Sequence, residues 1–273
     1  IESAIRFFDA HYQWQHRINA LEPLDENGHL VLFPSTACET YKDALNPPDL
    51  VGGLRYTVEA LLEIGGDLLS EEAQAYYRGL LVRIPPLSFL ERDGKHIIAP
   101  AKSWTGVINV EMPQLYTVFP YALYGLGKPD LQVAVDTWRH SGWNEKQLNH
   151  VSWHQQAIFC ALMGLTDDAA AYTLRKLTDS GRRFPAFWGP GHDWTPDHNW
   201  GGSGMIGLQE MLMQCDGRKI RLLPAWPEGW EVDFKLHAPF NTVVEGRYAG
   251  GKLEYLHVTP PERAADIIMG AEA

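Results

Sequence analysis

The sequence has few cysteines, and their spacing is not that of a metal site or a disulfide framework. Cys38, Cys160 and Cys215 are odd in number and far apart, and no Cys-x-x-Cys pair is present. Cysteine zinc sites and disulfide-rich folds depend on close or even-numbered cysteines. We therefore expect neither of these features, and we expect three buried free thiols.

Basic residues are also scarce. The chain has 23 Lys and Arg against 34 Asp and Glu, which gives a net charge of -11 over 273 residues. Nucleic acids and anionic membranes both require a basic surface, so neither is an expected partner. No apolar run reaches the length that spans a bilayer, and we expect no membrane insertion.

The sequence begins Ile-Glu-Ser, without an initiator methionine or a signal peptide. Ile5, Phe8 and Tyr12 already follow helical spacing at this point. We therefore expect a piece of a longer protein whose N-terminal part is missing here. Ten tryptophans fit either a surface that stacks on sugar rings or a large helical core.

Hydrophobic periodicity divides the chain into two predicted domains, residues 1–215 and 216–273. The first is predicted to be mainly helical, with about seven helices. Its clearest helical patterns are at 58–62, 131–138, 153–160, 167–177 and 203–214. Its longest loops are 31–53, 83–112 and 181–202. The second alternates polar and apolar residues in short runs, which predicts a small antiparallel β domain. Gly250-Gly251 predicts a hairpin turn, and the tail 261–273 is expected to be loosely packed.

A cluster of ionisable residues precedes the last predicted helix. His192, Asp193, Asp197 and His198 lie within seven residues. A metal site, a carbohydrate subsite and a helix cap all share this composition. The spacing matches no known zinc motif, so we expect neither a metal nor a cofactor.

Two segments resemble glycoside hydrolase family 95, which includes α-L-fucosidases and α-L-galactosidases. "PDHNWGGSGMIGLQEMLMQ" followed by "DGRKIRLLPAWPEGW" is similar to the end of the family's catalytic domain. The matching positions are Asp197, His198, Asn199, Trp200, Gly201, Gly202, Glu210, Met211, Leu212, Leu222, Leu223, Pro224, Ala225 and Pro227. "FPSTACETYKD" resembles the loop that carries the family's general acid, which maps to Glu39.

The resemblance implies the C-terminal part of an (α/α)6 toroid followed by a small antiparallel β domain. It implies an inverting exo-glycosidase that removes an L-fucose-like or L-galactose-like sugar from a plant or host glycan. In such an enzyme Glu39 is the general acid and Asp197 the general base. The parent protein is then expected to be secreted or periplasmic.

The sequence departs from the family at two places. "NVEMPQLYTVFP", residues 109–120, stands where the family has a histidine-rich motif that lines the sugar site. Leu115 and Tyr116 match that motif, but Glu111 stands among the positions of its histidines. The asparagine pair with which the family holds the attacking water would lie before residue 1.

Each candidate residue also has a structural interpretation. An inverting glycosidase needs a protonated carboxyl and a second group that activates water. Glu39 is either that protonated carboxyl or a solvated loop residue, which is the commonest state of a glutamate. Asp197, braced by Asn199, is either the base or a cap for the next helix, a role that Ser203 can fill alone. The remaining candidates, which either contact a sugar or serve packing and solvation, are His192, His198, Trp194, Trp200, Trp104 and Glu111.

A second function class remains open: a non-catalytic glycan-binding or scaffold module descended from such an enzyme. The missing asparagine pair and the absent histidines favour it for this chain. We expect residues 1–273 alone to be inactive and to expose apolar helix faces.

Overall fold

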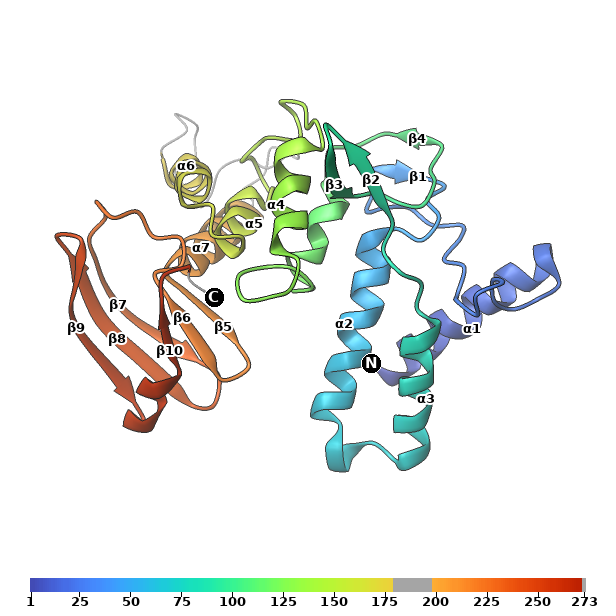
Figure 1. The fold of residues 1–273 in the computed structure, drawn as a ribbon, viewed down its shortest axis with the longest axis horizontal. Coiled ribbons are helices and arrows are strands. Elements are labelled where there is room, and N and C mark those ends of the chain that lie inside the picture. Colours follow the sequence, from blue (N-terminus) through green and yellow to red (C-terminus); the bar gives the residue numbers. More distant parts are fainter. Residues whose placement is uncertain (179–197, 272–273) are drawn as a thin grey trace. The chain divides into compact units, whose positions relative to one another are not determined.

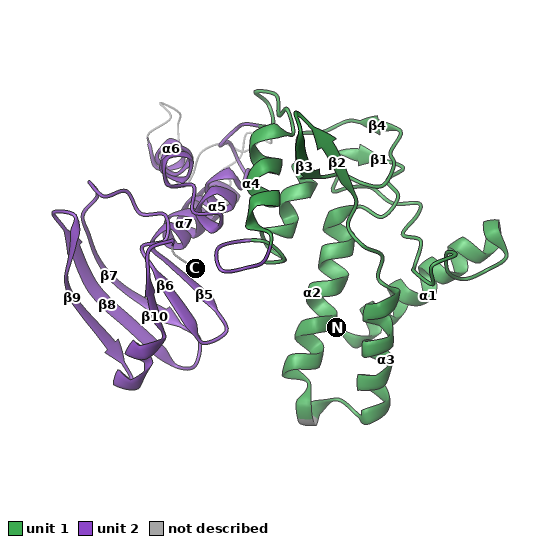
Figure 2. Cartoon of the chain, viewed as in Figure 1, with its two compact units in different colours: residues 1–124, 130–147 green, residues 125–129, 148–273 purple. Residues whose placement is uncertain are grey.

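The computed structural model describes residues 1–178 and 198–271 (Figure 1). The chain forms two compact units (Figure 2). Unit 1 comprises residues 1–124 and 130–147, and unit 2 comprises residues 125–129 and 148–273. The described part is mainly helical with small sheets, as the sequence predicts. None of its helices is both long enough and apolar enough to span a bilayer.

Unit 1 is built on three long helices joined by loops and short strands. Its elements are α1 (Glu2–Ala20), β1 (Tyr41–Lys42), α2 (Pro48–Ile64), η1 (Gly66–Leu68), α3 (Glu71–Arg83), β2 (Phe89–Arg92), β3 (Lys95–Ile98), β4 (Gly106–Val107), η2 (Pro113–Thr117) and α4 (Leu131–His140). Ile5 and Tyr12 of α1 are buried in one core with side chains of α2 and α3, which confirms the apolar spacing at the start of the chain. α3 begins at Ser70, whose hydroxyl accepts a hydrogen bond from Ala73 N at 3.2 Å.

A β-hairpin occupies part of the predicted long loop 83–112. β2 and β3 pair antiparallel, and Asp93 and Gly94 connect them with positive φ angles of 52° and 70°. An Asp-Gly pair favours this turn because both positions need positive φ. Thr137 of α4 holds the hairpin in place, since its hydroxyl accepts from Ile98 N at 2.9 Å. The Asp-Gly pair is therefore the signal that identifies the hairpin.

α1 also carries large apolar side chains that face solvent. Phe7, Trp14 and Ile18 are 62%, 59% and 57% exposed. Their spacing places them on one side of the helix, away from the buried Ile5 and Tyr12. The expectation of exposed apolar helix faces is met by this helix.

The described part of unit 2 combines three α-helices and a 3-10 helix with two small sheets. Its elements are α5 (Gln156–Leu162), α6 (Thr166–Leu177), α7 (His198–Leu212), β5 (Met213–Asp216), β6 (Lys219–Leu222), β7 (Val232–Ala238), β8 (Thr242–Ala249), β9 (Lys252–Thr259), η3 (Pro261–Asp266) and β10 (Ile267–Met269). The sheets have strand orders β10-β6-β5 and β7-β8-β9. The second sheet is antiparallel and includes the predicted turn at Gly250-Gly251. β10 pairs parallel with β6, so the first sheet is mixed.

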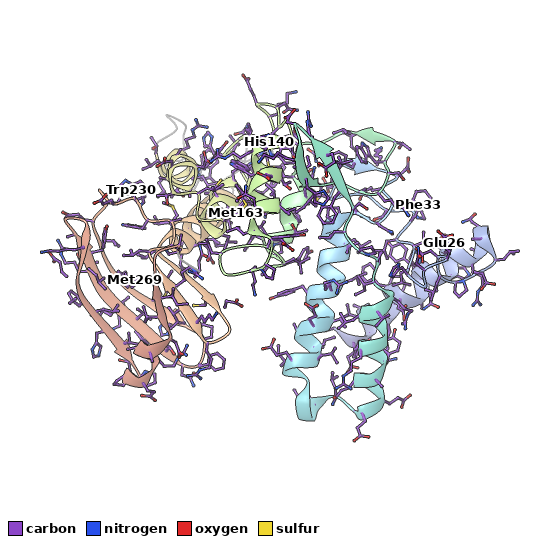
Figure 3. All side chains as sticks on the ribbon, viewed as in Figure 1. Glu26, Phe33, His140, Met163, Trp230 and Met269 are labelled. Atoms are coloured by element: carbon purple, nitrogen blue, oxygen red, sulfur yellow. The ribbon has the colours of Figure 1, made fainter. Side chains whose placement is uncertain are left out.

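The sheets of unit 2 are tied to its helices by hydrogen bonds. Gln214 Nε2 of β5 donates to Ala161 O at 2.8 Å, and Ala225 N donates to Met211 O at 3.1 Å. Helix gives way to strand between Leu212 and Met213, a few residues before the expected boundary. Trp230, labelled in Figure 3, precedes β7 and packs edge-on against Trp226, with ring centroids 5.5 Å apart.

Three expectations about this region differ from the structure. The tail is not loose over residues 261–269, because β10 adds to the sheet and the buried Arg263 Nε donates to Thr242 Oγ1 at 2.8 Å. Cys215 is exposed and Cys38 is only half-buried, whereas Cys160 is buried as expected. α5 begins at Gln156, so Trp153 lies outside the helix and stacks on His154 instead.

Gly246 allows close packing between two strands of the β7-β8-β9 sheet. A Cβ atom at this position would lie 2.7 Å from Phe234 Cζ and 2.9 Å from Tyr255 O. Because a backbone atom cannot move as freely as a side-chain tip, we expect Gly246→Ala to lower the free energy of unfolding by about 1–3 kcal/mol. Denaturant titration measures this, with Gly229→Ala as the control because its Cβ would meet nothing within 4 Å. Equal midpoints for the two variants would contradict the packing interpretation.

Candidate functional site

The structure places only part of the predicted site. His192, Asp193, Trp194 and Asp197 lie outside the described residues. His198 is the first residue of α7, and its side chain is likewise outside the description. The geometry that follows therefore concerns Glu39, Trp104 and Glu111 in unit 1, and separately Asn199 and Trp200 in unit 2.

Glu39 lies on a well-supported loop between α1 and α2, which we call the Glu39 loop (residues 35–46). Ala44 N donates to Ser35 O at 2.8 Å, and Asn46 Oδ1 accepts from Leu32 N at 2.9 Å. β1, inside this loop, pairs antiparallel with β4. These bonds fix the loop backbone, whereas the Glu39 side chain itself is exposed. A carboxyl on a fixed backbone, facing solvent, can meet a ligand from outside.

Asn109 connects the two glutamates of the predicted site. Its Nδ2 donates to Glu111 Oε1 at 3.2 Å and to Glu39 Oε2 at 3.5 Å. One amide group therefore lies within hydrogen-bonding distance of both carboxyls. Thr40 holds Glu111 from the other side, because its hydroxyl donates to Glu111 Oε2 and accepts from Glu111 N.

The carboxyls of Glu111 and Glu39 differ in their burial and in their hydrogen bonds. Glu111 is partly buried, and both of its carboxyl oxygens accept hydrogen bonds. Among the described residues, Glu39 makes one long hydrogen bond, with Asn109, and its side chain is exposed. Of the two roles left open for Glu111, sugar contact and surface charge, its contacts do not favour a solvated surface charge. Glu111 positions Asn109 and Thr40, and Glu39 is the carboxyl left available for a ligand.

Trp104 supplies an aromatic ring at this site. It is 37% exposed and packs against the edge of Tyr41, with ring centroids 5.6 Å apart. Tyr41 follows Glu39 by two residues, and Trp104 precedes β4, so the pairing of β1 with β4 brings the Trp104 ring against the Glu39 loop. Exposed Trp faces are the usual platforms for the apolar faces of sugars.

Cys38, a half-buried residue of the Glu39 loop, contacts the half-buried Asp49. Cys38 has a left-handed backbone with φ 48°, and its N–H donates to Asp49 Oδ2 at 2.8 Å. Burial, followed by the charge of Asp49, raises the pKa of the Cys38 thiol far above its usual value. A neutral thiol is a poor nucleophile, so Cys38 has a structural role. Tyr116 of η2 hydrogen-bonds to this thiol and links the family-like segment to the loop.

Trp200 is not available to stack on a sugar, which corrects its predicted role. It is 2% exposed, its Nε1 donates to Lys176 O at 2.8 Å, and the Lys176 ammonium lies 5.7 Å from its ring centroid. Ser203 is not the helix cap either, because α7 begins at His198 and the Ser203 hydroxyl donates back to Asn199 O at 2.5 Å. Asn199 is exposed in the first turn of the helix, next to the undescribed Asp197.

Glu210, in helix α7, is a half-buried carboxyl. Burial raises its pKa from 4.5 to about 7. Between pH 4.5 and about 7 the Glu210 carboxyl is therefore protonated in the folded state but ionised in the unfolded state. The contribution of Glu210 to the free energy of unfolding is then largest below pH 4.5 and is lost as the pH rises to about 7. We expect the free energy of unfolding of Glu210→Gln, relative to that of the unaltered protein, to rise by up to about 3 kcal/mol as the pH increases from 4.5 to 8.

Urea titration of both proteins across this pH range measures the effect. Glu228→Gln is a suitable control because Glu228 is an exposed carboxyl of the same unit. A difference between Glu210→Gln and the unaltered protein that does not vary with pH would contradict the burial of an ionisable Glu210.

No known protein-family model matches the chain, and no curated protein matches it. The functional interpretation therefore rests on the residues themselves. Asn109 and Thr40 are the site residues that the sequence did not reveal, although the quoted segment 109–120 contains the first of them. No sequence spacing indicates that Asn109 meets Glu39 or that Thr40 meets Glu111, because both contacts span about seventy residues and depend on strand pairing.

Proposed function

We propose that the protein is an inverting exo-glycoside hydrolase related to family 95, with Glu39 as general acid and Asp197 as general base. The observation that carries the proposal is the exposed Glu39 carboxyl, linked through Asn109 to Glu111 and accompanied by the exposed ring of Trp104. A carboxyl, an amide and a Trp face are the groups that glycosidases use to protonate, orient and stack a sugar.

In this proposal Glu39 protonates the glycosidic oxygen as the bond to the leaving group breaks. Asn109 orients the Glu39 carboxyl, and Glu111 orients Asn109. Asp197 removes a proton from the water that attacks the opposite face of the sugar. The substrate is a terminal L-fucose-like or L-galactose-like residue of a plant or host glycan, and the helices belong to an (α/α)6 toroid of a secreted or periplasmic protein.

The test uses the natural protein that contains residues 1–273. It is incubated with plant and host glycans that end in L-fucose or L-galactose, and released monosaccharides are identified by chromatography. We expect release by the unaltered protein and none by Glu39→Gln or Asp197→Asn. Release at the unaltered rate by both variants would sink the assignment. Glycan binding without release by the unaltered protein would favour a non-catalytic binding module.

A further inference from the structure

A second site lies in unit 1, behind the Glu39 loop. A cavity of about 370 Å³ opens between α1, the Glu39 loop, α2 and Tyr121. This volume falls within the range of small-molecule sites in proteins. The cavity is lined by Phe8, Tyr12, Ser35, Asp49, Leu54 and Tyr121 together with other residues of these segments.

Among the described residues that line the cavity there is one carboxyl and no basic side chain. Asp49 Oδ2 accepts a hydrogen bond from Cys38 N at 2.8 Å, which accounts for one carboxyl oxygen. The other oxygen, Oδ1, is shielded from solvent and accepts no hydrogen bond within the described part of the chain. A buried carboxylate is normally paired with a cation, because its desolvation is otherwise costly.

The charge of this carboxyl acts on the groups around the cavity. Burial raises the pKa of Asp49, although the N–H groups of Cys38, Asp49 and Leu50 lower it. Burial, together with the charge of Asp49, raises the pKa of both Tyr12 and Tyr121. These tyrosines come from separate segments, so the negative potential of Asp49 extends across the cavity. A cation within it would stabilise the ionised carboxyl.

The same cavity is lined by aromatic rings in fixed positions. Phe8 and Tyr12 lie one turn apart on α1, with ring centroids 6.3 Å apart and planes 19° apart. Tyr121 lies against α2, since a Cβ atom on Gly53 would be 3.0 Å from Tyr121 Cζ. The ring faces of Phe and Tyr attract cations within about 6 Å of their centroids.

We propose that this cavity binds a small organic cation, an ammonium group with apolar substituents, between the Asp49 carboxylate and the rings of Phe8, Tyr12 and Tyr121. A quaternary ammonium needs no hydrogen bond, so the Asp49 charge acts on it without a direct contact to Oδ1. The apolar substituents pack against Leu54 and the rings. The site is separate from the proposed glycosidase chemistry and does not depend on it.

The test compares choline with its neutral isostere 3,3-dimethylbutan-1-ol by isothermal titration at about pH 8, because a higher pH favours the ionised form of a carboxyl whose pKa is raised. We expect saturable choline binding that is at least about tenfold tighter than binding of the isostere. This comparison uses the unaltered chain and needs no variant. Equal affinity for the two compounds, or no choline binding, would overturn the proposal.

Asp49→Asn provides the second measurement. Its side-chain oxygen can still accept from Cys38 N, so we expect the fold to be kept, as checked by the thermal midpoint. Choline affinity should fall by at least about tenfold while affinity for the neutral isostere stays the same. Glu59→Gln is the control, because Glu59 is an exposed carboxyl of the same helix whose partner is Arg55. Unchanged choline affinity in folded Asp49→Asn would also overturn the proposal.

Discussion

Replacement of Glu39 by Gln is expected to lower kcat on a glycan by about 10²–10⁴-fold, the usual contribution of a general acid. Gln keeps the size of Glu and can still accept a hydrogen bond from Asn109, but it has no proton to give to the leaving oxygen. The Glu39 loop should stay in place because its backbone bonds do not involve the Glu39 side chain. The effect should therefore fall on kcat, with a much smaller change in KM.

Steady-state kinetics on the natural protein measures this loss, with Glu91→Gln as the matched control. Glu91 is also an exposed carboxyl of unit 1, on the β2–β3 hairpin, and its partner is His96 at 2.7 Å. The control should keep the unaltered kcat. A loss of less than about tenfold in Glu39→Gln would remove Glu39 from the chemistry.

Asp9→Ala is expected to lower the free energy of unfolding by about 3–5 kcal/mol, because it removes the buried partner of an ion pair and leaves the half-buried Arg83 unpaired. Asp9 is 4% exposed and joins α1 to α3. Its carboxyl accepts hydrogen bonds from Arg83 Nη2 at 2.7 Å, Tyr76 Oη at 2.6 Å and Gln13 Nε2 at 2.8 Å. After the substitution the Arg83 guanidinium and the Tyr76 hydroxyl both lose their acceptor.

Chemical denaturation measures this loss, and two further variants separate its causes. Asp9→Leu combined with Arg83→Met should be less destabilising than Asp9→Ala alone, because it leaves neither charge of the pair behind. Glu59→Ala removes an exposed partner of Arg55, 3.8 Å away, and should cost less than about 1 kcal/mol. A loss below about 1 kcal/mol in Asp9→Ala would show that the network does not hold α1 and α3 together.

The helices are the part of the fold that the sequence predicts best, because helical periodicity is local. α4 and α6 begin within a residue of their expected starts at 131 and 167. The apolar face of α1 is also as expected, but its buried Asp9 is not. Two partners of Asp9, Arg83 and Tyr76, lie on α3, and periodicity carries no information about such long-range pairs.

The candidate site, like the fold, could be predicted from the sequence only in part. The resemblance singles out Glu39 and Glu111, which are both in unit 1 and share one amide donor. Trp200, in the other family-like segment, is also a candidate sugar contact from the sequence. Its ring is buried against the Lys176 side chain within unit 2 and cannot stack on a sugar. A Trp in a sugar-site motif and a Trp in a core look alike in sequence, since both functions use the same large apolar ring.

The role of Glu39 as general acid is tested most directly by asking whether the loss of rate in Glu39→Gln depends on the leaving group of the substrate. The rates of the natural protein and of Glu39→Gln are compared on the glycan and on a dinitrophenyl glycoside of the released sugar, whose leaving group needs no protonation. We expect a loss of about 100-fold or more on the glycan and of less than about tenfold on the activated glycoside. Equal losses on the two substrates would contradict the assignment of Glu39 as the general acid.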